Sequence, residues 1–324
     1  MKINKLDSPL LVNPDCPVRF KKTGNILEIM YSEKRSKGGY ITKIDKDHFV
    51  DNRTGELKEF NHIENRSQDL SNVAKSLALG RDMINTNVVD VSCCRWVTLT
   101  YAENMTDSKK LYYDFKNFNK RCRALFGHYE YIIAAEPQGR GAWHLHCIFI
   151  FPNKAPFMPN DIVRDCWKKG FVTVKKLDNV DNVGAYLTAY LGDYELPKSL
   201  ENVKNLPCKI KEVEVEDENG VKKSKKYIKG GRLHLYPPGF HIFRWSRGVK
   251  KPEISIMSYK EAKKKASAAT LTFSKTVVLE DPEKDFKNTL QYEYYNSIGI
   301  LLEKNKTVNS DFNQFKPVLN QFKT

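Results

Sequence analysis

The hydrophobic pattern of residues 95–192 restricts the fold more than any other feature of the chain. A period of two predicts strands and a period near 3.6 predicts helices, and the two alternate along this stretch. Strands are predicted at 95–101, 129–136, 142–151 and 171–177, and helices from Thr106 to Gly127, from a cap at Asn160 to Gly170, and at 181–191. The order β-α-β-β-α-β-α predicts a ferredoxin-like, split βαβ core, in which helices cover one antiparallel sheet. We therefore expect an α+β fold with N- and C-terminal extensions.

Two histidines occupy alternate positions of the third predicted strand. His144 and His146 share one face of that strand, while Leu145 and Cys147 face the core. Imidazoles spaced in this way lie about 6–7 Å apart and can bind one cation. Histidine pairs on the wet face of a strand are more often plain surface residues, so the pair alone is modest evidence for a metal site.

Glu136 ends the preceding strand, and the loop 137–141 that follows it carries the glycines of a hairpin. Antiparallel pairing across this hairpin would bring the carboxylate beside the two histidines. Two imidazoles and one carboxylate suit Mn²⁺ or Mg²⁺, with positions left for water and phosphate oxygens. The alternative for Glu136 is a solvated acid at a strand end.

Two tyrosines follow on the predicted helix at 181–191. Tyr186 and Tyr190 are four residues apart and lie on one helix face. Half-buried packing rings are the ordinary explanation for such a pair. Opposite a divalent cation, however, a tyrosine phenol becomes a competent nucleophile toward a phosphodiester.

Taken together, these motifs resemble those of HUH endonucleases, specifically the rolling-circle replication initiator (Rep) proteins of bacterial plasmids, phages and integrative elements. The resemblance covers residues 96–191, and it continues through the runs Tyr236-Pro-Pro-Gly239 and Phe243-Arg-Trp-Ser-Arg-Gly248. It implies a metal-dependent nick in single-stranded or hairpin origin DNA. A tyrosine becomes linked to the 5′ phosphate, a host polymerase extends the free 3′-OH, and the strand is later rejoined.

Matched residue by residue, the resemblance assigns Glu136, His144 and His146 as metal ligands, Tyr186 as the nucleophile and Tyr190 as the second tyrosine. One position departs from the family pattern. Members often carry a lysine three residues after the tyrosine, but Ala189 and Asp193 stand at those positions here. Either Lys175, Lys176 or Lys198 supplies that cation, or the tyrosine assignment is wrong by one helical turn.

The charge of the chain is unevenly distributed. The formal net charge is +15, and Lys and Arg outnumber Asp and Glu by 17 to 8 in residues 201–265. Such an excess favours nucleic acid as the partner. The candidate DNA-binding residues are Arg140, Lys168, Lys169, Lys175, Lys176, Arg232, Arg244, Trp245 and Arg247. The alternative for Arg140 is a cap on the hairpin turn. For the others taken singly, a solvated basic face, with Trp245 in the core, is an equal alternative.

Four segments are expected along the chain. Residues 1–90 form an N-terminal extension with a possible DNA-binding helix from Asp69 to Asn85, and 91–200 form the endonuclease core. Residues 201–265 form the basic DNA-contacting segment, with a charged hairpin at 209–229, and 266–324 form a C-terminal extension.

Several sequence features are missing. The chain has no G-x-x-x-x-G-K-[ST] motif, so unwinding would need a host helicase. It has neither an apolar run of membrane-spanning length nor a signal peptide, so we expect a cytoplasmic protein with no membrane partner. A relaxase or transposase of the same fold and a non-catalytic DNA-binding protein remain as alternatives, and the oligomeric state stays open.

Overall fold

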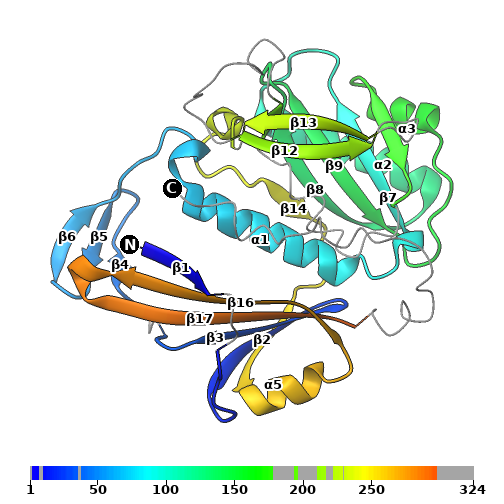
Figure 1. Cartoon of the computed structure of the whole chain (residues 1–324). Helices are drawn as coiled ribbons and strands as arrows, with labels where there is room; N and C mark the ends of the chain where they lie inside the picture. Colours follow the sequence, from blue (N-terminus) through cyan, green and yellow to red (C-terminus); the bar gives the residue numbers. More distant parts are fainter. Residues whose placement is uncertain are drawn as a thin grey trace. The chain divides into compact units, whose positions relative to one another are not determined.

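The computed structural model describes residues 2–6, 10–35, 38–177, 193–195, 210–216, 222–228 and 230–297. They belong to two compact units (Figure 1). Of the described residues, the terminal unit takes those up to His62 and those from Pro252 to Ser297. The central unit consists of Ile63–Lys251.

The central unit contains a five-stranded antiparallel sheet. In sheet order its strands are β10 (Val172–Lys175), β7 (Cys94–Thr100), β9 (Trp143–Ile150), β8 (Glu130–Pro137) and β14 (Phe243–Trp245). Helix α2 (Ser108–Phe126) connects β7 to β8, and β9 is inserted between these two strands. This is the split βαβ arrangement, so the α+β class predicted from the sequence is confirmed.

Helix α2 and helix α3 (Asn160–Trp167) cover one face of this sheet. The Asp107 side chain caps α2 by accepting hydrogen bonds from two backbone amides, and the predicted stop at Gly127 is its C-cap. The Phe118 ring lies 6.2 Å from the Phe149 ring of β9 and 5.7 Å from the Trp167 ring of α3. These aromatic contacts exclude solvent from the face of the sheet that α2 covers. None of the helices in the described ranges is long and apolar enough to cross a membrane.

Asn160 does not have the capping role that the sequence predicted. Pro159 occupies the N-cap position of α3 and makes no side-chain capping bond. The Asn160 Oδ1 atom instead accepts a hydrogen bond from the backbone N of Val174 at 2.7 Å. The side chain therefore ties the start of α3 to β10, a contact between elements that a local capping pattern does not reveal.

Helix α1 (Leu70–Asn87) packs on the opposite face, over β14. Asp69 caps it as predicted, accepting a hydrogen bond from the backbone N of Asn72 at 3.3 Å. A Cβ atom on Gly80 would lie 2.5 Å from the Phe243 ring, so only glycine allows this close approach. The helix thus belongs to the central unit, whereas the expected boundary at residue 90 assigned it to the N-terminal extension.

A second sheet of the central unit contains the predicted charged hairpin. Its order is β11 (Tyr194–Glu195), β13 (Lys222–Ile228) and β12 (Ile210–Glu216). The register places Glu212 opposite Lys226 and Glu216 opposite Lys222. Acidic and basic positions therefore face each other across the hairpin as expected.

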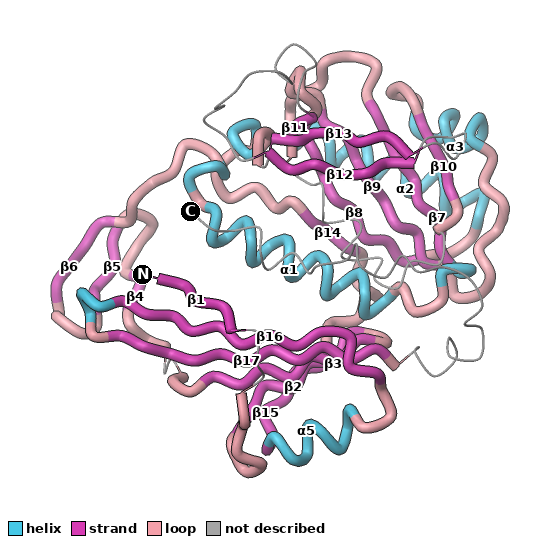
Figure 2. The backbone as a smooth tube through the Cα atoms, viewed as in Figure 1, coloured by secondary structure: helices cyan, strands magenta, loops and turns pink. Residues whose placement is uncertain are grey.

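The terminal unit is built around a six-stranded antiparallel sheet (Figure 2). Its order is β1 (Lys2–Leu6), β16 (Thr270–Asp281), β17 (Phe286–Asn296), β3 (Ile26–Ser32), β2 (Pro17–Thr23) and β15 (Glu253–Ser258). Helix α5 (Tyr259–Ala266) packs on one face, where Ala262 and Ala266 join a core with Val18, Leu27 and Ile29. The two ends of the chain, expected as separate extensions, are thus strands of one sheet because each completes the other's hydrogen bonds.

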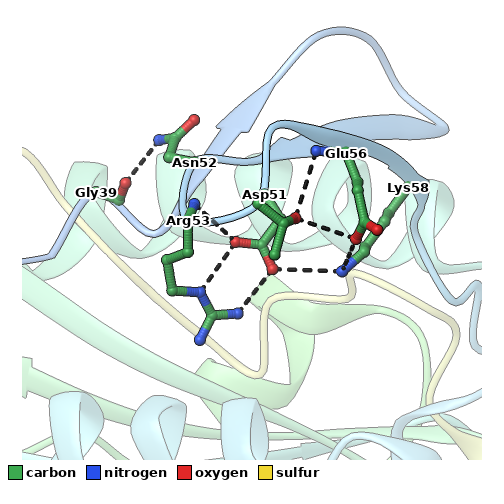
Figure 3. Close-up of polar contacts among 7 residues, drawn as sticks. Gly39, Asp51, Asn52, Arg53, Glu56 and Lys58 are labelled. Carbon is green, nitrogen blue, oxygen red and sulfur yellow. Dashed lines mark hydrogen bonds and ion pairs between the residues drawn. The ribbon is translucent and has the colours of Figure 1, made fainter.

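A small three-stranded sheet of the terminal unit, β4 (Ile41–Lys43), β5 (His48–Asp51) and β6 (Glu56–Glu59), is held at one turn by Asp51. Asp51 accepts hydrogen bonds from Arg53 Nε at 2.9 Å and Arg53 Nη2 at 2.7 Å, and Lys58 Nζ lies 3.4 Å away (Figure 3). The hydrogen bonds from Arg53 hold the pKa of Asp51 well below its usual range. This ionic turn fixes the end of β5.

Gly170 gives a test of how closely β7 and the α3–β10 connection must approach each other. An alanine Cβ at position 170 would lie 2.4 Å from the backbone N of Ala102 and the carbonyl O of Thr100, at a φ of +153°. We expect Gly170→Ala to lower the free energy of unfolding by about 2–4 kcal/mol, from backbone overlap and conformational strain together. Denaturant unfolding followed by tryptophan fluorescence measures the change.

Gly239→Ala is the matched control, because its φ of +67° is also positive but its Cβ would meet nothing within 4 Å. Strain alone should cost about 1–2 kcal/mol there. All four tryptophans lie between residues 63 and 251, so their fluorescence reports on the central unit. Equal losses for the two variants would contradict the steric explanation.

Candidate functional site

The β8–β9 hairpin brings the predicted site residues to one face of the central sheet. Its register pairs Glu136 with His144 and Ala134 with His146. Directly opposed residues share a face, so the carboxylate and the two imidazoles project together. Leu145 and Cys147 are fully buried on the α2 side, as predicted. The expected juxtaposition of these three side chains is therefore present.

Glu136 is the centre of this cluster. Its Oε2 atom accepts a hydrogen bond from His146 Nε2 at 3.1 Å, and its Oε1 atom lies 2.7 Å from Arg232 Nη1. Burial by itself would raise the pKa of Glu136, but the hydrogen bond from His146 and the charge of Arg232 outweigh it and hold the pKa below its usual value. The carboxylate is therefore charged at neutral pH.

His144 is held from the neighbouring strand. Its Nδ1 atom lies 3.0 Å from Thr100 Oγ1, the side chain directly opposite on β7, and 3.3 Å from Gln138 Nε2. Burial, assisted by the nearby His146, lowers the pKa of His144 to about 4. The tautomer in which Nδ1–H donates to Thr100 leaves the Nε2 lone pair available for a metal, whereas a hydrogen bond donated by the Gln138 amide to Nδ1 goes with the other tautomer.

His146 lies between two rings. Its ring centroid is 4.6 Å from that of His144, and it stacks on Trp96 at 5.2 Å. Within the described part of the chain its buried Nδ1 atom has no hydrogen-bond partner. The ring is thus fixed by stacking and by Glu136.

The donors present fit a hard divalent cation. Ligands at right angles around an ion with bonds of about 2.1 Å are about 3.0 Å apart, and His146 Nε2 and Glu136 Oε2 are 3.1 Å apart. Across the described ranges, however, no three His, Cys, Asp or Glu side chains are arranged as a complete set of metal ligands. The spacing of these two donors is compatible with a metal as well as with the hydrogen bond between them, and all three ligands stay predictions.

Residues 230–245 wrap around the Glu136 end of β8. The Tyr236 hydroxyl donates to the carbonyl of Ala135 at 3.1 Å, and the backbone N of Ala135 donates to the carbonyl of Ile242 at 2.9 Å. Tyr236 is 1% exposed. Nearby, the backbone N of Gly230 donates to Asp193 Oδ1 at 2.8 Å. This segment, which the sequence predicted only as a DNA-binding surface, therefore belongs to the site.

Most of the candidate DNA-binding residues are exposed: Arg140, Lys168, Lys169, Lys175, Lys176, Arg244 and Arg247. Lys175 lies directly opposite Trp96, on the histidine face of the sheet. Some of the candidates also make contacts within the protein: Arg140 Nη2 donates to the carbonyl of Tyr101 at 2.8 Å, Lys169 Nζ lies 3.9 Å from Asp114 Oδ1, Arg244 stacks 3.5 Å over the Tyr112 ring, Trp245 packs against the core and Arg232 pairs with Glu136.

The candidate nucleophiles Tyr186 and Tyr190 lie outside the described residues, as does Lys198. Sequence reasoning also missed three contributors to the cluster: Thr100, Gln138 and the ion pair of Arg232. Thr100 could have been found from the alternation of its strand, which puts it on the histidine face. Arg232 has no local signal, because its partner lies in a distant part of the sequence.

Comparison with known proteins gives a match to a family model. Residues 94–195, about a third of the chain, match the model of a family of replication-associated proteins of the ORF2 type. The matched range includes Glu136, His144 and His146. No curated protein and no solved structure is significantly similar to the chain. The match supports a role in DNA replication.

The lowered pKa of His144 gives a pH dependence of stability. The unfolded chain binds a proton at this histidine near pH 6.5 and the folded chain only near pH 4, so stability falls as the pH drops through this window. At about 1.4 kcal/mol per pKa unit, we expect a loss of about 2 kcal/mol between pH 6.5 and 5. His144→Gln should remove this loss.

Denaturant unfolding in the presence of a chelator, followed by tryptophan fluorescence, measures the effect. Above pH 5 the titration of Glu136 does not contribute, because its pKa is held below 4.5. His128→Gln, at a histidine whose side chain is 66% exposed, is the control. An identical pH slope in wild type and His144→Gln would show that His144 is not desolvated.

Proposed function

We propose that the chain is a rolling-circle replication initiator of the HUH type, which nicks and rejoins single-stranded origin DNA through a 5′-phosphotyrosine intermediate. The observation that carries the proposal is the β8–β9 register, which groups Glu136, His144 and His146 on one face. The family match adds support, because its range includes these residues and both candidate tyrosines.

In the proposed reaction, His144 Nε2 and Glu136 Oε2 would hold Mn²⁺ or Mg²⁺ together with His146 Nε2, once that nitrogen has lost the proton that it donates to Glu136. The ion would supply a Lewis acid that polarises the scissile phosphodiester. The Tyr186 oxygen attacks the phosphorus, a Tyr–O–P bond forms and the bond from phosphorus to the 3′ oxygen breaks. The phenol proton passes to solvent, the 3′ oxygen takes up a proton from solvent and leaves as a 3′-OH, and Tyr190 is the second tyrosine. Rejoining reverses these bond changes.

Another cation must contact the phosphate in place of the lysine that is missing after the tyrosine. Asp193, which stands at one of the two expected lysine positions, accepts a hydrogen bond from the backbone of Gly230. Its side chain therefore anchors the backbone at Gly230 and carries no positive charge that could contact the phosphate. Lys175 is exposed and lies on the histidine face, opposite Trp96. We assign it the role of the cation that contacts the phosphate.

The proposed partners follow from the same chemistry. The exposed lysines and Arg247 bind the phosphates of single-stranded or hairpin origin DNA. A host helicase unwinds the duplex beyond the nick, and a host polymerase extends the 3′-OH.

A second candidate function is non-catalytic DNA binding. It is favoured by the Arg232 guanidinium, which holds one oxygen of Glu136, and by the lack of a complete three-ligand set among the described residues. Such a protein would bind DNA with a steep salt dependence and form no covalent product with any divalent ion.

A covalent-adduct assay tests the proposal. The full-length protein is incubated with Mn²⁺ and single-stranded oligonucleotides tiled across the replicon that carries its gene, and adducts are resolved on denaturing gels. We expect an adduct that requires Mn²⁺. Tyr186→Phe should abolish it, since the phenol oxygen is the nucleophile, and His146→Ala should reduce its rate at least about 100-fold.

Tyr113→Phe is the control, since this tyrosine is 65% exposed on α2. An adduct that Tyr190→Phe rather than Tyr186→Phe abolishes would move the primary role to Tyr190. Full adduct formation by both variants would refute the tyrosine assignment. Salt-sensitive binding without an adduct in Mn²⁺ or Mg²⁺ would establish the non-catalytic alternative.

A further inference from the structure

Arg232 is largely buried and contacts Glu136, whereas a residue that only bound DNA would be exposed on the surface. Its guanidinium is 2.7 Å from Glu136 Oε1, and its side chain is only 21% exposed. Arginine keeps its charge at all accessible pH values and presents a rigid planar fork. The two groups therefore form an ion pair at any pH at which Glu136 is charged.

The two oxygens of Glu136 have different partners. Oε1 pairs with Arg232 and Oε2 with His146, and these partners come from segments far apart in the chain. A carboxylate held at both oxygens cannot rotate freely about its last bond. Oε2 is thereby turned toward the imidazole that lies at a ligand-to-ligand distance from it.

The arginine is itself held in place by its surroundings. Gly230 is anchored by its hydrogen bond to Asp193, and Tyr236 is buried and bonded to the carbonyl of Ala135, the residue before Glu136. Anchors on both sides of Arg232 fix the backbone that carries it. The guanidinium is therefore positioned by the fold. A residue that orients a metal ligand without binding the metal must be fixed in this way.

We propose that Arg232 is a positioning residue that makes Glu136 a one-oxygen metal ligand; this rests on the proposed function. By holding Oε1, Arg232 presents Oε2 alone to the ion. Two imidazole nitrogens and one carboxylate oxygen leave three positions of a six-coordinate ion open. A bidentate carboxylate would take one of these positions, so Arg232 preserves it for a phosphate oxygen of the DNA.

The contrary role, in which Arg232 competes with the metal for Glu136, makes the opposite prediction. A competitor must be displaced before the ion binds, so its removal tightens metal binding. A positioning residue loses its orienting contact when truncated, and the loss of such contacts typically weakens metal binding about 10- to 100-fold.

Mn²⁺ binding to the full chain, measured by titration calorimetry without DNA, separates these roles. We expect Arg232→Met to bind Mn²⁺ about 10- to 100-fold more weakly than wild type. Arg232→Lys, which keeps the charge but not the planar fork, should fall between them. Arg164→Met is the matched control, because Arg164 is an exposed arginine on α3. It should bind Mn²⁺ as wild type does.

A double-mutant cycle with Glu136→Gln shows whether Arg232 acts through Glu136. In the Glu136→Gln background, Arg232→Met should leave the Mn²⁺ affinity unchanged. The double variant also removes the unpaired buried carboxylate, so the comparison within the Glu136→Gln background, together with Arg232→Lys, is available even if Arg232→Met alone folds poorly. Unchanged or tighter Mn²⁺ binding by Arg232→Met or Arg232→Lys, or a further loss in the Glu136→Gln background, would overturn the proposal.

Failure of the metal site itself is distinguishable. If wild type binds no Mn²⁺, or if His144→Ala/His146→Ala binds it as wild type does, the metal-dependent function fails and the role of Arg232 fails with it. If the histidines are required and Arg232→Met is unaffected, only the inference about Arg232 is wrong.

Discussion

A buried carboxylate is the interaction on which the candidate site depends. Glu136 is 8% exposed, and a charged group at this depth is stable only when its oxygens are paired. His146 supplies one partner across the β8–β9 hairpin, and Arg232 supplies the other from residues 230–245. The charge on Glu136 therefore requires both the hairpin and this later segment to be in place.

The central sheet separates packing from chemistry by its two faces. On one face Leu145, Cys147 and Phe149 are buried against α2 and α3. On the other, α1 covers the region of Phe243, while His144 and His146 keep polar neighbours. Because strand side chains alternate, each residue of β9 contributes to only one of these functions. A rigid apolar face thus gives the imidazoles a fixed base.

The local patterns predicted the strands of the split βαβ core and the helices α2 and α3, whereas the helix expected at 181–191 lies outside the described residues. The alternation around His144 and His146 predicted their shared face. They also predicted that Glu136 would lie across the hairpin, because a short loop fixes the register of its strands. The roles of Asn160 and Arg232 were not predictable, since each is set by a partner in another element. It was equally unpredictable that β1 and β3 would share one sheet with β16 and β17. Local periodicity carries no information about the pairing of strands that are distant in sequence.

Because the terminal unit is discontinuous in sequence, it must finish folding after the central unit has been synthesised. β2 and β3 leave the ribosome early, yet Ser32 of β3 pairs with Leu290 of β17, which is made after the whole central unit. A two-stranded hairpin is marginally stable alone, and domains tend to fold as they emerge. The central unit is thus complete while the first strands still present unpaired edges. A stop codon within β16 or β17 would therefore spare every residue of the site and leave β3 with an open, aggregation-prone edge.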